Sequence, residues 1–441
     1  MTDLAPSALA PSALAPSAQR TGPRRHSHIA IPAFGAFVVG TDAFVIAGLI
    51  PGITRTLEIG VGAAGQLMTV FALAYVPLAP VLAALTSGWS RRAVLVTALA
   101  VFALGNAATA VATGYELALV SRVIAAAGAA LLTAAASATA AWPPPGERRR
   151  GGPAAAATMG LTFALALGVP MGTAIGSSMG WRATMWTLTA LSLLVLPLIA
   201  VRPPDVRQPR TAPRRQPSPL TDRAVWRLLA ITVVAFAGIC IPYTYISAIF
   251  EPSVHDGRLA IVLLVFGVAG AAGTLTAAHL TDRHGPRRVI IIALLALTVV
   301  LLMLPAIRDS YAATLPVTAA TGFLSFAVTV PQQRQLIALL PAAGSTATSL
   351  HRSALYLAIA LSAATGALGL DALDSAALPP LAAPFVLAAA GLTWLTGRPS
   401  YPPHLLAHHQ SGRLASWPRA AARPGRITDA CSPTSPEAPA G

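Results

Sequence analysis

The sequence predicts an all-α polytopic membrane protein whose twelve transmembrane helices form two pseudo-repeated six-helix bundles. Of its residues, 55% are hydrophobic and only 10% are charged, whereas soluble domains carry about 25% charged residues. Apolar stretches of about 20 residues, long enough to cross a bilayer as helices, recur along most of the chain. The ten-residue alternation of barrel strands is absent. The predicted spans are 29–50, 61–84, 93–112, 116–141, 154–178, 183–201, 226–250, 258–279, 288–307, 311–338, 349–370 and 379–397.

A polar segment divides these spans into two halves. Residues 202–225 are rich in proline and arginine, and they separate a first bundle, 29–201, from a second, 226–397. The ends of the chain, 1–28 and 398–441, are rich in proline, serine and alanine, and the first repeats LAPSA three times without the apolar core of a signal peptide. We expect 202–225 to be a cytoplasmic linker and both ends to be disordered cytoplasmic tails.

The basic residues predict how the helices cross the membrane. All thirty are arginine, and with a cytoplasmic N-terminus the predicted inner segments hold 24 of them and the outer loops four. This distribution satisfies the positive-inside rule, so we expect a multi-pass protein of the plasma membrane with both termini in the cytoplasm. Topology then explains the net charge of +15 without nucleic-acid binding. Cys240 and Cys431 are too few for a disulfide framework or a metal cluster.

Asp42 is the acidic residue that lies deepest in any predicted span. A carboxylate in hydrocarbon costs at least about 2.5–3.5 kcal/mol, so it should be neutralised, paired or placed on a water-filled cavity. With the predicted boundaries, Asp42 lies roughly 12 Å and Arg122 roughly 9 Å below the outer ends of their helices, at 1.5 Å per residue. We expect the two side chains to pair. Alternatively, Arg122 extends to the outer headgroups, as Arg352 in span 11 is expected to do at the inner side.

Two loops at corresponding positions of the halves resemble each other. LTSGWSRRAVLV (85–96) follows span 2, and LTDRHGPRRVII (280–291) follows span 8, at an offset of 195 residues. Two related halves around a midplane site are typical of secondary transporters. The second loop also resembles the signature loop of the major facilitator superfamily, G-x-L-a-D-r-x-G-r-r. The matching residues are Asp282, Arg283, Gly285, Arg287 and Arg288.

This resemblance implies that the carboxylate and the arginines of the second loop latch neighbouring helix ends and release them when the transporter changes face. An ion pair at a helix junction can favour one conformer of a two-state equilibrium. The alternative is a solvated basic loop that only obeys the positive-inside rule. In the first loop Ser87 replaces the acid, so any latch there must be weaker or built differently.

Span 5 carries small residues at successive four-residue steps, which places them on one helix face where another backbone can approach closely. Pro170 predicts a kink. The segment resembles the Gly-Pro motif of the proton-driven antiporter branch, which implies a gate, although ordinary tight packing also explains it. The small residues are Gly160, Ala164, Gly168, Gly172 and Gly176.

Three further segments resemble the arabinose-efflux-permease-like drug antiporters. Arg122 followed by Gly128 is similar to an R-x-x-x-x-x-G element linked to proton transfer. GTDAFVIAGLIP, around Asp42, is similar to their first span, in which the acid commonly stands one residue later. Tyr243 and Tyr245 match a segment of span 7 and, with Gln66, are expected to line a substrate cavity. For the tyrosines the alternative is an aromatic belt, and for Gln66 a hydrogen bond between helices.

The expected function follows from the resemblance, which covers about residues 29–397. It implies the major facilitator fold and a monomer that exports a small, apolar or cationic organic molecule in exchange for protons. No Walker loop or metal-ligand cluster is present in the sequence, so we expect neither an enzyme nor a cofactor. The alternatives are a proton-coupled uptake symporter for a sugar or amino acid, against which the Gly-Pro element argues, and a non-transporting receptor, against which Asp42 argues.

Overall fold

The computed structural model describes residues 24–140, 159–201, 222–254, 257–340 and 344–396. Its regular elements are helical, which confirms the predicted fold class. The predicted C-terminal tail lies outside these residues, as do most of the N-terminal tail and most of the linker. Residues 24–28, which we assigned to the N-terminal tail, instead form the start of the first helix.

Eleven helical segments of the described chain are long and apolar enough to cross a membrane, and α7 corresponds to the remaining predicted span, 183–201. The first half contains α1 (Arg24–Leu57), α2 (Val61–Leu85), α3 (Arg91–Ala110), α4 (Tyr115–Ala140), η2 (Ala164–Gly168), α6 (Val169–Met179) and α7 (Trp181–Val201). The second half contains α8 (Arg223–Thr244), α9 (Ile246–Ile249), α10 (Arg258–His284), α11 (Pro286–Met303), η4 (Leu304–Ala306), α12 (Tyr311–Ala327), α13 (Thr329–Leu339), α14 (Gly344–Ala372), η5 (Ser375–Ala377) and α15 (Leu378–Leu395).

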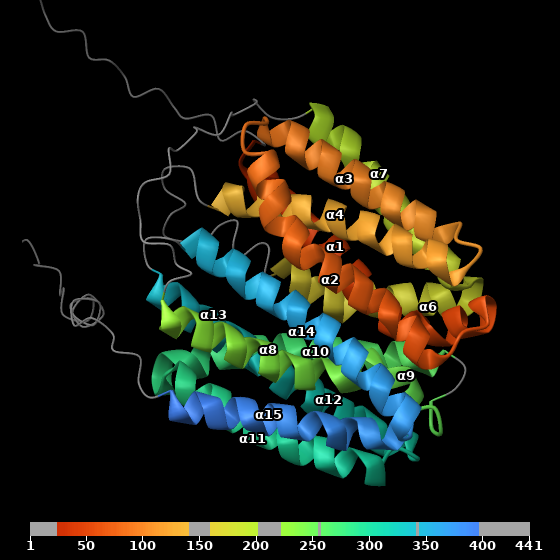
Figure 1. The fold of residues 1–441 in the computed structure, drawn as a ribbon, viewed down its shortest axis with the longest axis vertical. Coiled ribbons are helices and arrows are strands. Elements are labelled where there is room, and N and C mark those ends of the chain that lie inside the picture. The colour runs from red at the N-terminus through yellow and green to blue at the C-terminus, as the bar shows by residue number, and fades with distance from the viewer. Residues whose placement is uncertain (1–23, 141–158, 202–221, 255–256, 341–343, 397–441) are drawn as a thin grey trace, which may run out of the picture. The chain divides into compact units, whose positions relative to one another are not determined.

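The two halves meet along two pairs of helices. α2 packs against α14, and η2 and α6 pack against α10. Figure 1 shows the helices of the first half, red to yellow-green, beside those of the second half, green to blue, with α2 and α14 between them. The seams between the halves are therefore the places where a site can contact both bundles.

The first helix is longer than predicted. The predicted span ends at residue 50, but α1 continues through Pro51 to Leu57. Side chains accommodate this last stretch, since Thr54 and Arg55 donate to the carbonyl oxygen of Pro51 at 3.2 and 2.9 Å. Asp42 consequently lies about 22 Å along the helix from its predicted outer end, at 1.5 Å per residue, and the shallower estimate was wrong.

Three other spans are interrupted. Span 7 is interrupted at Tyr245, between α8 and α9, and span 10 at Val328, between α12 and α13. Span 5 contains a π-helical turn, η2, directly before the helix that carries Pro170. A π-turn widens the helix and is frequent at functional sites. The π-turn is thus an irregularity next to Pro170 that the residue pattern does not reveal.

Candidate transport site

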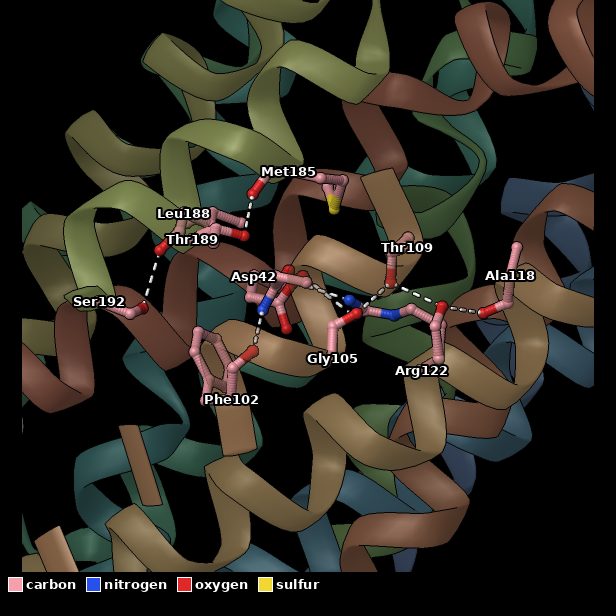
Figure 2. A network of polar contacts seen from close by, with 12 residues as sticks. Asp42, Phe102, Gly105, Thr109, Ala118, Arg122, Met185, Leu188, Thr189 and Ser192 are labelled. Carbon is pink, nitrogen blue, oxygen red and sulfur yellow. Dashed lines mark hydrogen bonds and ion pairs between the residues drawn. The ribbon is translucent and has the colours of Figure 1, made fainter. Parts of the chain in front are cut away.

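Asp42 and Arg122 form an ion pair in the interior of the first half. Nη1 of Arg122 lies 2.7 Å from Oδ1 of Asp42, and both side chains are 0% exposed. Nη2 of Arg122 donates to the backbone carbonyl of Asp42 at 3.4 Å. Figure 2 shows the arginine reaching from α4 towards α1. The structure therefore brings together the two charges that the sequence places inside the spans of the first half.

The pair is incompletely hydrogen-bonded. Oδ2 of Asp42 and Nε of Arg122 have no hydrogen-bond partner among the described residues. The Asn106 side chain is close enough to Asp42 to interact with its carboxyl group, but its amide donates to the carbonyl oxygen of Phe102 at 3.1 Å. Oδ2 is consequently the oxygen of this carboxylate that is available to accept a proton.

Packing between α3 and α4 fixes the position of Arg122. The hydroxyl groups of Thr109 and Ser121 lie 2.7 Å apart, so the residue before Arg122 is bonded to α3. Gly128 allows the two backbones to approach, because a Cβ there would lie 2.4 Å from the backbone nitrogen of Phe102. The guanidinium also lies 4.5 Å from the centre of the Phe71 ring on α2, a cation–π contact.

Gly128→Ala tests this positioning. The added methyl group would collide with backbone, which cannot rotate away, so we expect a loss of about 1–3 kcal/mol of stability and displacement of Arg122. Thermal unfolding of the purified protein measures it. Gly391→Ala in α15 is the matched control, because a Cβ there meets nothing within 4 Å. Equal stability of the two variants would contradict the close α3–α4 contact.

The small face of span 5 holds α1, the helix of Asp42. A Cβ at Gly168 would lie 2.0 Å from Oγ1 of Thr41, which precedes Asp42. The contacts recur at matching positions along span 5 and α1, so larger residues on span 5 would push α1 away. They pair Gly160 with Ala33, Gly168 with Thr41, Gly172 with Val45 and Gly176 with Leu49.

The residues expected to line a substrate cavity have different surroundings. Tyr243 donates to the carbonyl oxygen of Phe44 on α1 at 3.1 Å, and its ring contacts those of Phe44 and Phe266. It lines a cavity of about 10 Å³ in the second half, the smallest size that holds a water molecule. Gln66 is partly exposed on α2. Tyr245 does not line this cavity.

Tyr245 instead joins the two halves. Its hydroxyl group donates to the carbonyl oxygen of Ala363 on α14 at 2.6 Å. A Cβ at Gly65 of α2 or at Gly366 of α14 would lie 2.3 Å from this side chain. Tyr245 is thus enclosed by glycines from both halves. Its hydroxyl had been expected to meet substrate, and here it closes the seam between α2 and α14.

A cleft lies on the other seam, towards the predicted inner end. It measures about 40 Å³ and is mostly apolar. Leu161 and Leu165 contribute from span 5, Thr274 from α10, and Phe326 and Val330 from α12 and α13. The two halves still touch beside this cleft, because a Cβ at Gly267 of α10 would lie 2.1 Å from the carbonyl oxygen of Leu165. Tyr245 joins the halves nearer the predicted outer end.

The predicted signature loop is mostly helical, because α10 extends to His284 and α11 begins at Pro286. This α10–α11 junction connects several helix ends of the second half. Asp282 pairs with Arg334 of α13 at 2.5 Å. Arg287 donates to the carbonyl oxygens of Thr393, at 3.1 Å, and of Trp394, at the end of α15. Gly285 ends α10 with φ +81°, a conformation that favours glycine. Arg283 and Arg288 are exposed.

Several contributors were not predicted as site residues. Arg334 was counted only as one arginine of the inner side, and Phe71 as one apolar residue of span 2. Asn106 is an isolated polar residue of span 3, and a hydrogen bond between helices is the ordinary expectation for such a residue. A charged residue after Pro331 near a helix end is a signal that could have identified Arg334. No feature of the sequence separates Phe71 from other phenylalanines, since its role depends on packing.

Comparisons with known proteins agree with this architecture. The sequence profile described as Major Facilitator Superfamily matches residues 33–363. The chain is 30% identical over 341 residues to the uncharacterized MFS-type transporter YbcL of Bacillus subtilis (strain 168), covering 77% of this chain and 87% of that one. It is 30% identical over 304 residues to a chloramphenicol resistance protein of Streptomyces lividans, covering 67% and 77%.

The fold matches solved transporters as well. A crystal structure of the nucleoside transporter NupG superposes with a TM-score of 0.69 at 12% sequence identity, covering 84% of this chain and 99% of that one. At this identity the likeness concerns the fold alone. Together with the profile match over most of the described chain, it shows that the protein belongs to the major facilitator superfamily of membrane transporters.

Proposed function

We propose that this transporter exports small organic molecules in exchange for protons by alternating access. The observation that carries the proposal is the buried Asp42–Arg122 pair, in which one carboxylate oxygen has no hydrogen-bond partner among the described residues. An acid in the middle of a transmembrane helix is a functional site by default, and its partner here is identified. The proton is the simplest ion that such a site can bind and release.

Protonation of Asp42 would change the interactions of α1 and α4. The neutral carboxyl group no longer compensates Arg122, and leaving a buried charge without its partner costs about 3–5 kcal/mol. A conformer that lets water or substrate reach Arg122 then becomes favourable. A proton gradient drives transport if protonation and substrate binding favour different conformers.

The packing of the two halves favours a state that is closed at the predicted outer end. Tyr245 closes the seam nearer the predicted outer end, and a Cβ at Gly62 would lie 3.3 Å from that of Ala367. The cleft beside Leu161 lies towards the predicted inner end. In this state the substrate enters from the cytoplasm, which suits an exporter with both termini inside.

Two observations favour export over uptake. The small face of span 5 packs along α1 beside Asp42, so movement at the Gly-Pro element reaches the proton site directly. One relative with similarity over most of its length is described as a chloramphenicol resistance protein. Resistance is what removal of a toxic compound from the cell produces, so chloramphenicol is the first compound to test.

Transport assays in inverted membrane vesicles test the proposal. The vesicle interior would be made acidic. Uptake of radiolabelled chloramphenicol and other drugs should then exceed that in vesicles without the protein, because an exporter moves its substrate into the lumen of an inverted vesicle. Dissipating the pH gradient should remove the difference. Uptake of a labelled sugar or amino acid into right-side-out vesicles, with no drug transport, would show an importer instead.

The ion pair between Asp282 of α10 and Arg334 of α13 is proposed to favour the conformer of this structure, in which it is formed. Both side chains are exposed, so the pair is worth at most about 1 kcal/mol, or roughly fivefold in population. Asp282→Asn should slow disulfide formation between cysteines at Gly62 and Ala367, after replacement of the native cysteines, by up to about fivefold. Reversing both charges (Asp282→Arg with Arg334→Asp) should restore the rate. An unchanged rate in Asp282→Asn would remove the latch role.

A further inference from the structure

Arg352 is a cation inside a transmembrane helix with no acidic partner among the described residues. It lies on α14, within the spanning segment Thr346–Ala372, and its side chain is partly exposed. A charged residue at such a position is costly and usually faces the interior of the bundle or a cavity. The site described above uses Arg122 and leaves Arg352 without a role.

Two tyrosines lie within electrostatic range of this arginine. Arg352 is close enough to Tyr75 of α2 and Tyr356 of α14 to interact electrostatically with both. Their rings are stacked across the seam, with centres 3.8 Å apart and an angle of 29° between the planes. Arg352 and Tyr356 are one helical turn apart, so they share a face of α14. That face points towards the first half.

This cluster is connected to the ion pair. The Tyr356 ring lies 6.1 Å from that of Phe71, and Phe71 in turn lies under the guanidinium of Arg122. The residues therefore extend continuously from the proposed proton site to Arg352. A molecule bound between the halves at this depth would contact aromatic rings and a cation.

The residues between the Asp42–Arg122 pair and Arg352 form a path whose formal charges sum to one positive charge. Asp42 compensates Arg122, and the other acids of the described helices lie near helix ends, as Glu116, Asp282 and Asp371 do. An uncompensated cation in a low-dielectric path repels cationic substrates and attracts oxygen acceptors. This argues against the cationic substrates that the family resemblance implies.

We propose that Arg352 and Tyr356 form a subsite for aromatic molecules that carry an oxygen acceptor, with carboxylates bound most tightly. The buried ring of Tyr75 positions Tyr356 by stacking against it. The guanidinium binds the acceptor group, and the exposed part of Tyr356 contacts the ring. The inference rests on the proposed function, because it assumes that substrate passes between the halves. An anion here and a proton on Asp42 attract each other, so exchange requires that the two favour opposite conformers.

Equilibrium binding tests the subsite without requiring transport. We would titrate the full-length protein in nanodiscs with three probes of the same shape: naphthalene-2-carboxylate, naphthalene-2-carboxamide and 2-naphthylmethylamine. Affinity should fall in this order, with the carboxylate bound at least about tenfold more tightly than the amine, because hydrogen bonds to charged groups are strong. Arg352→Gln should remove the preference, and Arg352→Lys should retain most of it.

Controls separate the subsite from general effects. Arg92→Gln changes an exposed arginine at the start of α3 and should keep the wild-type preference. Tyr356→Leu should weaken all three probes similarly, since it removes the ring contact. Equal affinity for the three probes, no binding of the carboxylate, or an unchanged preference in Arg352→Gln would each overturn the subsite. None of these results depends on whether protons drive transport, so a failure of the proposed function is recognised separately.

Discussion

Replacing Asp42 by asparagine is expected to abolish proton-driven transport and to destabilise the protein. Asparagine can still accept a hydrogen bond from Arg122, but it cannot neutralise the charge. Both side chains are fully buried, and breaking a buried ion pair costs about 3–5 kcal/mol. Thermal unfolding and gradient-driven drug uptake in inverted vesicles would measure the two effects.

A double substitution separates stability from coupling. Asp42→Asn combined with Arg122→Gln removes both charges, so most of the stability should return, whereas the proton site is still missing. We therefore expect a folded transporter whose drug flux no longer responds to a pH gradient. Reversing the two charges should recover part of the stability lost in either single reversal. No recovery would argue against a direct contact between the residues.

Gly65→Val is expected to prevent closure at the predicted outer end and to reduce transport strongly. Its Cβ would lie 2.3 Å from the hydroxyl oxygen and 2.8 Å from a ring carbon of Tyr245. The tyrosine cannot move aside easily, since Ala363 and Gly366 hold it on the other side. Overpacking of about 1–3 kcal/mol corresponds to a shift of roughly fivefold to more than a hundredfold in the closed population.

The cysteine pair at Gly62 and Ala367 reports this closure, because the two Cβ positions are close to disulfide distance. Cross-linking and drug transport should both fall in Gly65→Val. Gly60→Val is the matched control, since a Cβ at Gly60 meets nothing within 4 Å. Adding Tyr245→Ala to Gly65→Val should restore cross-linking. Normal cross-linking in Gly65→Val would show that Tyr245 does not control closure.

The fold was predictable because a segment in the hydrocarbon of a membrane must satisfy its own backbone hydrogen bonds, which leaves helices and closed barrels as the possible structures. Helix ends were less predictable: the predicted first span ends before Pro51, but the side chains of Thr54 and Arg55 support about two further turns. The π-turn at Ala164–Gly168 and the break at Tyr245 depend on how neighbouring helices pack, which the local sequence does not specify.

The proximity of Asp42 and Arg122 was predictable from the free-energy cost of burying a charged side chain in the membrane. The depth estimate for Asp42 was wrong. Burying either charged side chain alone in the membrane is unfavourable, and pairing them lowers this cost. The surroundings of this pair could not be predicted in the same way. Phe71, Asn106 and Tyr356 are ordinary residues for a membrane helix, and they contribute because the fold brings α1, α2, α3, α4 and α14 together.

Gradient reversal tests the central claim, that Asp42 couples transport to protons, most directly. Wild-type protein and the Asp42→Asn/Arg122→Gln variant would be reconstituted in proteoliposomes with a drug that the wild type transports. For the wild type, the drug should accumulate on the more acidic side and change sides when the pH gradient is reversed. The variant should only equilibrate it. Accumulation by the variant to the wild-type level would contradict the coupling role of Asp42.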